Sequence, residues 1–463
     1  MTTESIDILA EISPGETRIA LVDGTGQLIE LRIERIDRPS LVDGIYRGRV
    51  RRVEPGLDGA FVDFGTGMEG FLRRHKGLHE GQAITVQVSR DGSGSKGPAL
   101  SDRIVLHGRY LDWTPSRPGV VYAARLGGGR ERARLESLMP DVLREGEGVS
   151  VRAAAAYVDD SAITHEADRL RAAWQQVEAI VPEATVPGIL VPAPSLLVRT
   201  LRDVESGDVV IDDRQALREA RTLVDDHMPD RQGRVQLHAE PVPIFEAHDI
   251  ADAVEGICDR VVTLPGGARL TFDSAEALTA IDVDSAGSGG RGPSDSASLK
   301  INMAVLPEVA RQIRLRNISG LIVVDFISVK RKDARAQFLQ AVRRSFRDDP
   351  LQVDVLDLTV AGLVELTRRR MAPPLQDQLR QRISSTASPA ATACAILRAA
   401  LRLKGPGVPC AVMSPDVAAL LEGGSFAPAL AAVNKQLGQP IRIARSSGGE
   451  DWEVAMRTGN QTS

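Results

Sequence analysis

Short runs of alternating hydrophobic and polar residues fill the first hundred positions of the chain. Residues 5–33 alternate as β-strands do, and the turn-forming sequence VDGTGQ at 22–27 predicts a hairpin. From Ile45 to about Leu106, short strands are broken by glycine, as in IYRGRVRRVEPGLDGAFVDFG and AITVQVSRDG. Short strands at this spacing predict a small closed barrel.

Further along, strand patterns alternate with helical ones. The expected helices lie at 165–180, 214–227, near 248–258, up to Asn317 and at 332–347. The expected strands lie at 208–213, 234–238, 261–273, 278–284, 320–327 and 351–358, with a glycine-rich loop at 285–293. This alternation predicts an α/β fold with several domains. After Pro373-Pro374, an Ala-rich tail is typical of a small separate unit.

Two carboxylates end the strand-like sequence LTAIDVDSAG at 278–287. Asp282 and Asp284 stand one residue apart, so in an extended chain their side chains point the same way and could hold a cation. Because Asp, Ser and Gly also favour turns, a simple turn at the strand end is the alternative.

A third acid, Asp325, directly follows residues 322–324, which we expect to be buried on both faces of a sheet. A buried carboxylate needs a partner, which Arg311, Arg314 or Arg316 on the preceding helix could supply. Alternatively, a helical crossover makes the two strands neighbours and brings the three acids to one sheet edge. Their repulsion would then favour a divalent cation such as Mg²⁺, which can assist phosphodiester cleavage.

The barrel region combines positive charge with aromatic residues. IYRGRVRR at 45–52 contains four arginines and no acid, and Phe61, Phe64 and Phe71 follow. Exposed aromatics beside a basic strand favour binding of single-stranded nucleic acid through base stacking and phosphate neutralisation. The phenylalanines could instead fill the barrel core, and we expect some of them in the core and some on the surface.

Composition limits the remaining classes of function. With 463 residues and a net charge of −5, any polyanion site must be a local patch rather than a uniformly basic coat. Three cysteines without a CxxC pair indicate neither a zinc ribbon nor a disulfide framework. We see no signal peptide and no membrane segment, so a cytoplasmic location is expected.

These motifs together resemble the bacterial ribonuclease E/G family along most of the chain. GIYRGRVRRVEPGLDGAFVDFG is similar to that family's RNA-binding barrel, and EALTAIDVDSA with ARQIRLRNISGLIVVDF is similar to its catalytic segment. The resemblance implies that Asp282 and Asp325 bind a catalytic Mg²⁺, and that Asp284 stands where the family has Asn. It also implies a site role for Asn302, and RNA contacts by Phe61, Phe71 and Lys96. Arg47 and Arg49 of the basic strand are expected to contact RNA phosphates.

The chain also departs from the family pattern. Where the family has an Arg-Thr pair that senses a 5′-monophosphate, SVRAAAA keeps Arg152 but has Ala153, and an assisting Arg is replaced by Gln352. The family's CPxC zinc-link is absent from MAPPLQDQLRQRISS, so no structural zinc is expected, and a homo-oligomer would not be zinc-linked. Pro307 is expected to interrupt the helix before ARQIRLRN.

The resemblance implies a composite architecture with five parts. They are a ribonuclease H-like subdomain (1–36 and 197–257), an OB-fold RNA-binding barrel (37–107), a 5′-sensor-like domain (108–196), a deoxyribonuclease I-like catalytic domain (258–378) and a small C-terminal domain (379–463). The implied function is Mg²⁺-dependent endonucleolytic cleavage of single-stranded RNA in RNA processing or decay, with weak 5′-monophosphate sensing. The alternative is a non-catalytic RNA-binding factor in ribosome assembly or RNA decay.

Overall fold

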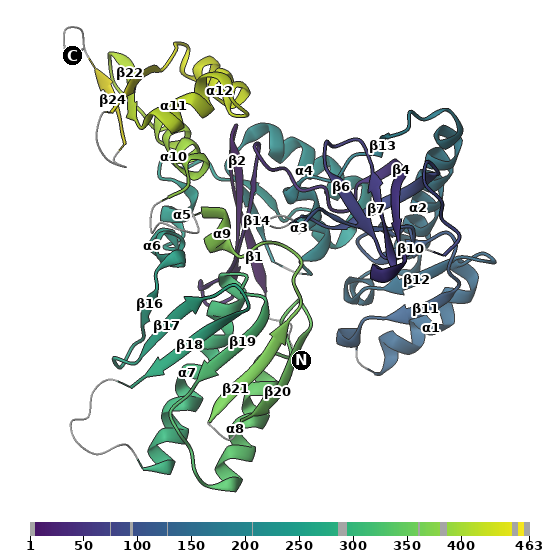
Figure 1. The fold of residues 1–463 in the computed structure, drawn as a ribbon, viewed down its shortest axis with the longest axis horizontal. Coiled ribbons are helices and arrows are strands. Elements are labelled where there is room, and N and C mark those ends of the chain that lie inside the picture. Colours follow the sequence, from purple (N-terminus) through teal and green to yellow (C-terminus); the bar gives the residue numbers. More distant parts are fainter. Residues whose placement is uncertain are drawn as a thin grey trace. The chain divides into compact units, whose positions relative to one another are not determined.

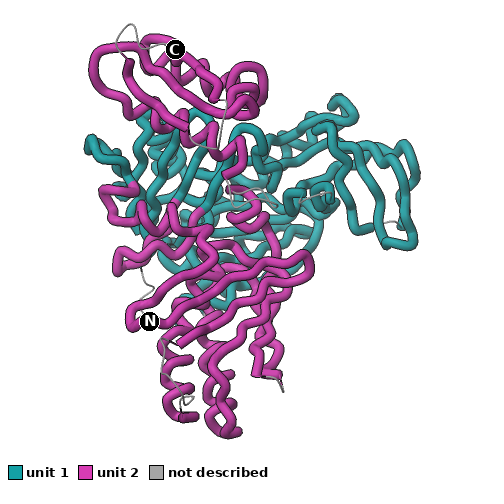
Figure 2. Tube along the Cα trace, turned by 60° about the vertical axis from the view of Figure 1, so that its left-hand side comes forward, with its two compact units in different colours: residues 1–19, 32–244 teal, residues 20–31, 245–463 magenta. Residues whose placement is uncertain are grey.

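The chain forms two compact units in the computed structural model, residues 1–19 with 32–244 and residues 20–31 with 245–463 (Figure 2). The structure describes residues 5–74, 76–92, 96–126, 128–205, 207–285, 294–359, 362–379, 387–446 and 452–457. Most of the expected glycine-rich loop, residues 286–293, therefore lies outside the described residues, as do residues 380–386 of the segment without a zinc-link motif.

The N-terminal strands form a five-stranded sheet with two strands from later in the chain. Its order is β15-β14-β1-β2-β3, with β1 Ile6–Ser13, β2 Glu16–Asp23, β3 Leu28–Arg35, β14 Val209–Ile211 and β15 Val235–Leu237. The turn between β2 and β3 falls at the expected VDGTGQ sequence. Helix α4 (Arg214–His227) has the expected bounds, because Asp213 caps its first turn by accepting a hydrogen bond from Ala216.

Five short strands close into the barrel that the glycine-broken pattern predicts. They are β4 Ile45–Glu54, β5 Gly59–Asp63, β6 Glu69–Leu72, β7 Ala83–Arg90 and β8 Ala99–Ser101, in the order β4-β5-β6-β8-β7. Pairing of β4 with β7 completes the closure, and β13 (Gly188–Val191) adds to the outer edge of β4. Phe64 and Tyr46 pack edge to face in the barrel core.

The segment after the barrel forms a four-stranded sheet packed against two helices. The strand order is β11-β12-β10-β9, with β9 Leu106–His107, β10 Leu111–Thr114, β11 Gly119–Tyr122 and β12 Gly148–Val151. The helices are α1 Arg130–Val142 and α2 Asp160–Ile180, and α3 Leu196–Asp203 follows. Helix α2 begins before the expected residue 165 because Asp159 caps it at Ala162.

A six-stranded mixed sheet carries the acids singled out in the sequence (Figure 1). Its order is β16-β17-β18-β19-β21-β20, with β16 Val261–Thr263, β17 Arg269–Ser274, β18 Leu278–Asp284, β19 Gly320–Asp325, β20 Val353–Leu358 and β21 Leu363–Arg368. Strands β18 and β19 run parallel, as the helical crossover predicts, while their other neighbours are antiparallel. The sequence pattern did not predict β21, which inserts between β19 and β20.

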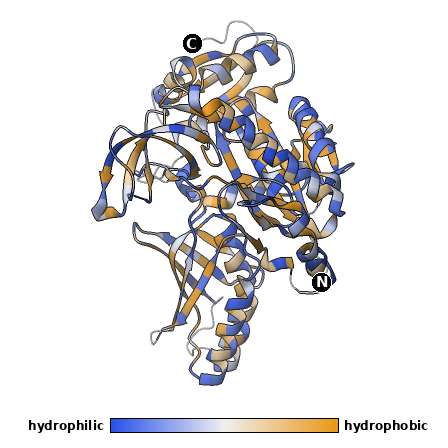
Figure 3. Ribbon diagram, turned by 90° about the vertical axis from the view of Figure 1, so that its right-hand side faces the viewer, coloured by the Kyte–Doolittle hydropathy of each residue, from blue (hydrophilic) through white to orange (hydrophobic). Residues whose placement is uncertain are grey.

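Two helices cover one face of this sheet, and the core lies between them and the strands. They are α7 Asp295–Leu315 and α8 Lys332–Ser345, and Figure 3 shows hydrophilic and hydrophobic residues alternating along both. Their apolar sides pack on Ile281, Val283, Ile322 and Val324, which are buried. The expectation that residues 322–324 are buried on both faces is wrong, because Val323 is only half-buried on the side that the helices leave open.

Helix α7 runs without interruption through Pro307, contrary to the expected break. Pro307 is exposed, so its ring lies on the solvent side of the helix. The carbonyl that loses its hydrogen bond can then bind water, which reduces the loss that a proline causes inside a helix.

The remaining elements are three short helices and the C-terminal segment. In place of one helix near 248–258, the chain forms α5 Ile244–Ala247 and α6 Ala251–Glu255, and α9 spans Leu375–Leu379. The Ala-rich tail has its own core and a sheet in the order β23-β22-β24, with α10 Pro389–Leu401, β22 Val408–Met413, α11 Pro415–Gly423, α12 Ala427–Leu437, β23 Arg442–Arg445 and β24 Glu453–Arg457.

Helix length and composition bear on membrane spanning. Across the described ranges, no single helix is both long enough and apolar enough to cross a bilayer. Helices α11 and α12 reach that length and composition only as a pair bent by 81°. Residues of both helices contribute to the core of the C-terminal segment.

Candidate functional site

Asp282 and Asp325 lie directly opposite each other on the neighbouring strands β18 and β19. Side chains alternate along β18, so Ile281 and Val283 face the helices while Asp282 and Asp284 are exposed on the other face. Because directly paired residues project from the same face of a sheet, Asp325 joins them there. The strand ends therefore bring the three predicted carboxylates to one open surface, instead of a simple turn.

The electrostatics of this surface are those of uncompensated negative charge. Partial burial, then the nearby charges of Asp284 and Asp325, raise the pKa of Asp282 above its usual range. In the described part of the chain, none of the three expected arginine partners bonds to Asp325. Arg311 pairs with Glu308, Arg314 with Glu30, and Arg316 donates to Gln312 and to the backbone oxygen of Asp259.

The donor set suits a hard divalent cation with few protein ligands. Mg²⁺ is commonly held by one or two carboxylates while water and substrate phosphates complete its coordination. Asp282 and Asp325 provide two adjacent carboxylates, and a cation between them would relieve the repulsion that raises the pKa of Asp282. Within the described residues, however, no group of three or more His, Cys, Asp or Glu side chains is arranged to hold a metal.

Asn302 holds the chain just beyond Asp325. Its side chain is fully buried on α7, where Nδ2 donates to the backbone oxygen of Ile327 at 2.8 Å. The backbone N–H of Ile327 donates in return to Oδ1 of Asn302 at 3.1 Å. Both ends of the amide are thus used within the protein, so Asn302 fixes the exit of β19 rather than facing the open surface.

The barrel distributes its phenylalanines between core and surface, as expected. Phe64 is fully buried, whereas Phe61 and Phe71 are half-buried on the outer side, with ring centroids 5.3 Å apart. Arg52 lies over the ring of Phe61 at 4.8 Å. Two aromatic rings and a guanidinium therefore share one outer surface, which is the combination that base stacking requires.

The basic residues predicted on the barrel differ in their freedom to bind a ligand. Arg47 donates to the hydroxyl of Thr85, and Arg49 donates to the backbone oxygens of Gly81 and Val186. Both are half-buried, so they brace the barrel as well as carrying charge. Lys96, by contrast, is exposed.

Comparison with known proteins places this arrangement in a family. Residues 105–371, more than half of the chain, match the description Ribonuclease E/G family, and this span includes β18, α7 and β19. The chain belongs to the ribonuclease E/G family. Ribonuclease G of Haemophilus influenzae is 29% identical over 402 residues, covering 81% of this chain and 82% of the relative.

Two further ribonuclease E/G relatives extend the comparison. Ribonuclease G of Escherichia coli strain K12 is 29% identical over 399 residues, covering 81% of each chain. Ribonuclease E of the same strain is 30% identical over 385 residues, which cover 78% of this chain and 36% of that longer protein. The similarity to these relatives therefore reaches well beyond residues 105–371.

Arg152, the residue that the family resemblance implies for 5′-end sensing, is held by two carboxylates. Arg152 donates to Asp203 at 2.8 Å and to Asp112 at 3.3 Å. Ala153 beside it is buried and offers no hydroxyl. Gln352, which directly precedes β20, is exposed and donates to Asp354 on that strand, so its amide is also engaged.

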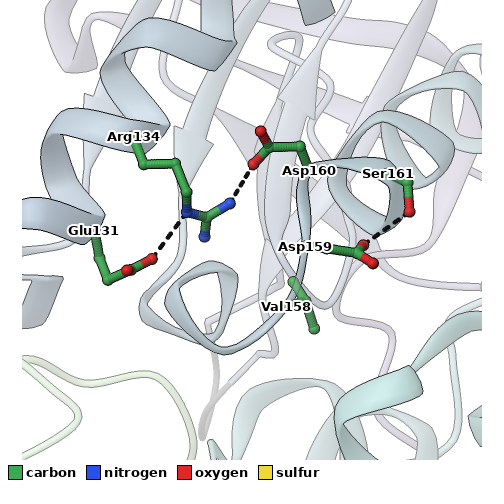
Figure 4. A pocket seen from close by; sticks show the side chains of 6 residues that line it. All are labelled: Glu131, Arg134, Val158, Asp159, Asp160 and Ser161. Atoms are coloured by element: carbon green, nitrogen blue, oxygen red, sulfur yellow. Dashed lines mark hydrogen bonds and ion pairs between the residues drawn. The ribbon is translucent and has the colours of Figure 1, made fainter.

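One hollow in this segment is acidic. Six residues of α1, α2 and the turn before α2 line a volume of about 450 Å³: Glu131, Arg134, Val158, Asp159, Asp160 and Ser161 (Figure 4). Arg134 is shared between Glu131 and Asp160, while Asp159 accepts from Ser161 and caps α2. Three carboxylates against one cation make this hollow a poor site for a phosphate.

Sequence reasoning missed two residues that border the predicted sites in this ribonuclease E/G chain. Glu365 on the unexpected strand β21 pairs with Val323 and so projects from the same face as Asp325. The alternation LVELT at 363–367 carried that signal. The position of Arg52 over Phe61 had no signal in one strand alone, because it depends on the register between β4 and β5.

Proposed function

We propose that this protein is a Mg²⁺-dependent endoribonuclease that cleaves single-stranded RNA in RNA processing or decay. The observation that carries the proposal is the pairing of Asp282 with Asp325 on an exposed sheet face, inside the segment that matches the ribonuclease E/G family. Relatives named Ribonuclease G and Ribonuclease E support the same class of activity.

Asp282 and Asp325 would hold the metal, with Asp284 beside them on the same face. When bound, Mg²⁺ supplies an activated water and neutralises charge on the phosphate under attack. The carboxylates of Asp282 and Asp325 are held side by side, because they project from adjacent strands that are hydrogen-bonded to each other. Asn302 keeps Asp325 in place by fixing the backbone of Ile327 two residues later.

The architecture we propose follows the five parts that the family resemblance implies. The sheet that carries the acids (258–378) would be deoxyribonuclease I-like, and the barrel (37–107) an OB-fold that binds RNA. The remaining parts would be a ribonuclease H-like subdomain (1–36 and 197–257), a 5′-sensor-like domain (108–196) and a small C-terminal domain (379–463). The closed five-stranded barrel and the mixed sheet support this division.

We also propose that any homo-oligomer of this chain forms without zinc. The three cysteines are buried, form no disulfide and lie on three separate elements: Cys258, Cys394 and Cys410. They offer no paired thiolates of the kind that a tetrahedral zinc site between two chains requires. A chelator should therefore leave the mass measured by light scattering unchanged.

The second candidate is an RNA-binding factor that does not cleave. One observation favours it: no metal-holding group of three or more acidic, His or Cys side chains exists among the described residues. A single experiment separates the candidates. Purified protein is incubated with a labelled single-stranded oligonucleotide in Mg²⁺ or in EDTA, and both cleavage and binding are measured.

Cleavage in Mg²⁺ that stops in EDTA, with binding retained, supports the endoribonuclease. Binding without cleavage under either condition supports the non-catalytic factor. Cleavage that continues undiminished in EDTA contradicts the role of the metal.

A further inference from the structure

Five residues on five neighbouring strands of the barrel form one continuous row. Arg52 on β4 is paired with Phe61 on β5, and Phe61 with Phe71 on β6. Phe71 is paired with Ala99 on β8, and Ala99 with Arg90 on β7. Because direct partners project from the same face, the row carries an arginine at each end and two aromatic rings between them.

The row lies on the outside of the barrel. The residues next to its three central members fill the core, namely Ala60, Leu72 and Leu100. At its two ends the strand register shifts between buried Val50 and Arg52 and between buried Val88 and Arg90, so both arginines stand on the exposed side. Arg52 and Arg90 are exposed, and the three residues between them are half-buried. Since neighbouring strands are about 4.8 Å apart, the row extends about 19 Å along the surface.

The aromatic rings of the row are held in position from beneath. A Cβ atom at Gly59 would lie 2.2 Å from the ring of Phe71, so this ring rests directly on the backbone of a glycine. The edge-to-face contact with Phe61, at 61° between ring planes, holds Phe71 from the side. The guanidinium of Arg52 covers Phe61 at 4.8 Å.

The two arginines differ in their partners. Arg52 forms an ion pair with Glu54 at 2.6 Å, with both side chains well exposed to solvent. In the described ranges Arg90 has neither a side-chain hydrogen bond nor an ion pair. A phosphate that binds Arg52 would therefore have to replace the carboxylate of Glu54. A phosphate that binds Arg90 would displace no side-chain partner.

We propose that this row binds single-stranded RNA across the strands, with Arg52 as a third stacking plane and Arg90 as a phosphate contact at the far end. The inference rests on the proposed RNA-directed function and assigns these two arginines within it. A planar guanidinium can both stack on bases and neutralise phosphate, whereas an ammonium group only neutralises phosphate. On binding, Arg52 exchanges Glu54 for the RNA while it stays over Phe61.

The experiment measures binding of a short labelled oligouridylate in EDTA, so that cleavage does not interfere, over a series of salt concentrations. Arg90→Gln should lower affinity severalfold and reduce the slope of log affinity against log salt by about 0.7, the loss of one phosphate contact. Arg52→Lys keeps the charge but loses the stacking plane, so affinity should fall by roughly fivefold or more. Glu54→Gln should raise affinity, because it frees Arg52.

Two controls make the result specific. Arg144→Gln removes an exposed arginine outside the barrel and should change neither affinity nor slope. For an oligonucleotide with abasic positions, Arg52→Lys should no longer lower the binding affinity, because stacking needs bases. Arg90→Gln should still lower it, because a phosphate contact does not.

The outcomes separate this inference from the proposed function. Wild-type affinity and slope in Arg90→Gln, or wild-type affinity in both Arg52→Lys and Glu54→Gln, would overturn the row while leaving RNA binding by the barrel intact. The proposed use of the barrel for RNA fails as a whole under either of two results. One is that the wild-type protein does not bind the oligouridylate, and the other is that the Phe71→Ala variant binds it as well as the wild-type protein does.

Discussion

Asp282 and Asp325 form a directly opposed pair of carboxylates on two parallel strands whose outer neighbours are both antiparallel. The β–α–β crossover through α7 joins the two strands on which the acids meet. Partial burial, then repulsion by Asp284 and Asp325, raise the pKa of Asp282. Without a bound cation, the protein therefore holds these negative charges at some cost in stability. Sites that bind cations commonly have this property.

Asp325→Asn should separate function from stability. The substitution removes one potential metal ligand and one repelling charge while keeping the shape, so cleavage in Mg²⁺ should fall by orders of magnitude. Because the pKa of Asp282 is raised in part by Asp325, it should move down in the variant, and the melting temperature should stay the same or rise. The measurements are gel cleavage assays, NMR titration and calorimetry.

Two matched variants test the same site. Asp284→Asn should retain much more cleavage than Asp325→Asn, because it introduces the residue that the family resemblance implies at this position. Asp354→Asn changes an exposed acid on β20 of the same sheet and should have no effect on cleavage. Wild-type-like cleavage by Asp325→Asn would remove the basis for the metal site.

Asn302→Ala should reduce both stability and cleavage. It leaves the N–H and C=O of the half-buried Ile327 without their side-chain partners, and each such loss costs about 1–3 kcal/mol. The exit of β19 would loosen, so Asp325 would no longer be held opposite Asp282. Urea unfolding and cleavage rates measure the two effects, and a variant that loses activity with unchanged stability would argue instead for a direct role of Asn302 in the reaction.

Much of this site could be predicted from the sequence, and its limits have physical causes. The meeting of Asp282 and Asp325 was predictable because a helical crossover makes successive parallel strands neighbours. The pair of hydrogen bonds between Asn302 and the backbone of Ile327 could not be predicted, because it depends on how the chain bends after Phe326. Alternation put Phe61 and Phe64 on opposite faces of β5 and its extension, but only closure of the barrel decided which face is inside.

Phe64→Ala and Phe71→Ala should have opposite profiles. Phe64 is fully buried against Tyr46, so its truncation should lower the free energy of unfolding by about 3–5 kcal/mol. Phe71 is half-buried on the outer surface, so its truncation should weaken RNA binding by about 1–3 kcal/mol with a smaller loss of stability. Chemical unfolding and binding to single-stranded RNA give the two numbers for each variant. Equal losses of stability would indicate that both rings belong to the core.

The stability of the protein should fall between about pH 4 and pH 7 because of Asp212. Burial, with smaller contributions from the charges of Glu11 and Asp213, raises its pKa to about 7, against the bond donated by the Ile12 N–H. The folded state then binds more protons than the unfolded state in this range, so raising the pH favours unfolding. Asp212→Asn should flatten this dependence and be the more stable protein at pH 8, as urea unfolding at pH 5 and pH 8 can measure. A wild-type protein that gains stability over this range relative to the variant would contradict the assignment.

Discrimination between 5′-monophosphate and 5′-hydroxyl RNA should be weak. A terminal phosphate needs several charge-assisted donors in one pocket, but Arg152 is already bonded to Asp112 and Asp203. Burial alone would raise the pKa of Asp203, yet Arg202 and Arg152 outweigh it and hold this pKa well below its usual range. Arg152 would have to exchange these stable partners for the phosphate, and neither Ala153 nor Gln352 can supply the missing charge.

The test compares cleavage rates on two oligonucleotides that differ only at the 5′ end, in the wild-type protein and in Arg152→Gln. We expect a ratio below about tenfold, or 1.4 kcal/mol, in the wild-type protein. The variant should keep that ratio, because the charge of Arg152 is used within the protein rather than on the RNA. A larger preference that Arg152→Gln abolishes would mean that RNA displaces Asp203 and that the sensor functions. A larger preference that survives in the variant would locate a rebuilt sensor on other arginines of the 108–196 segment.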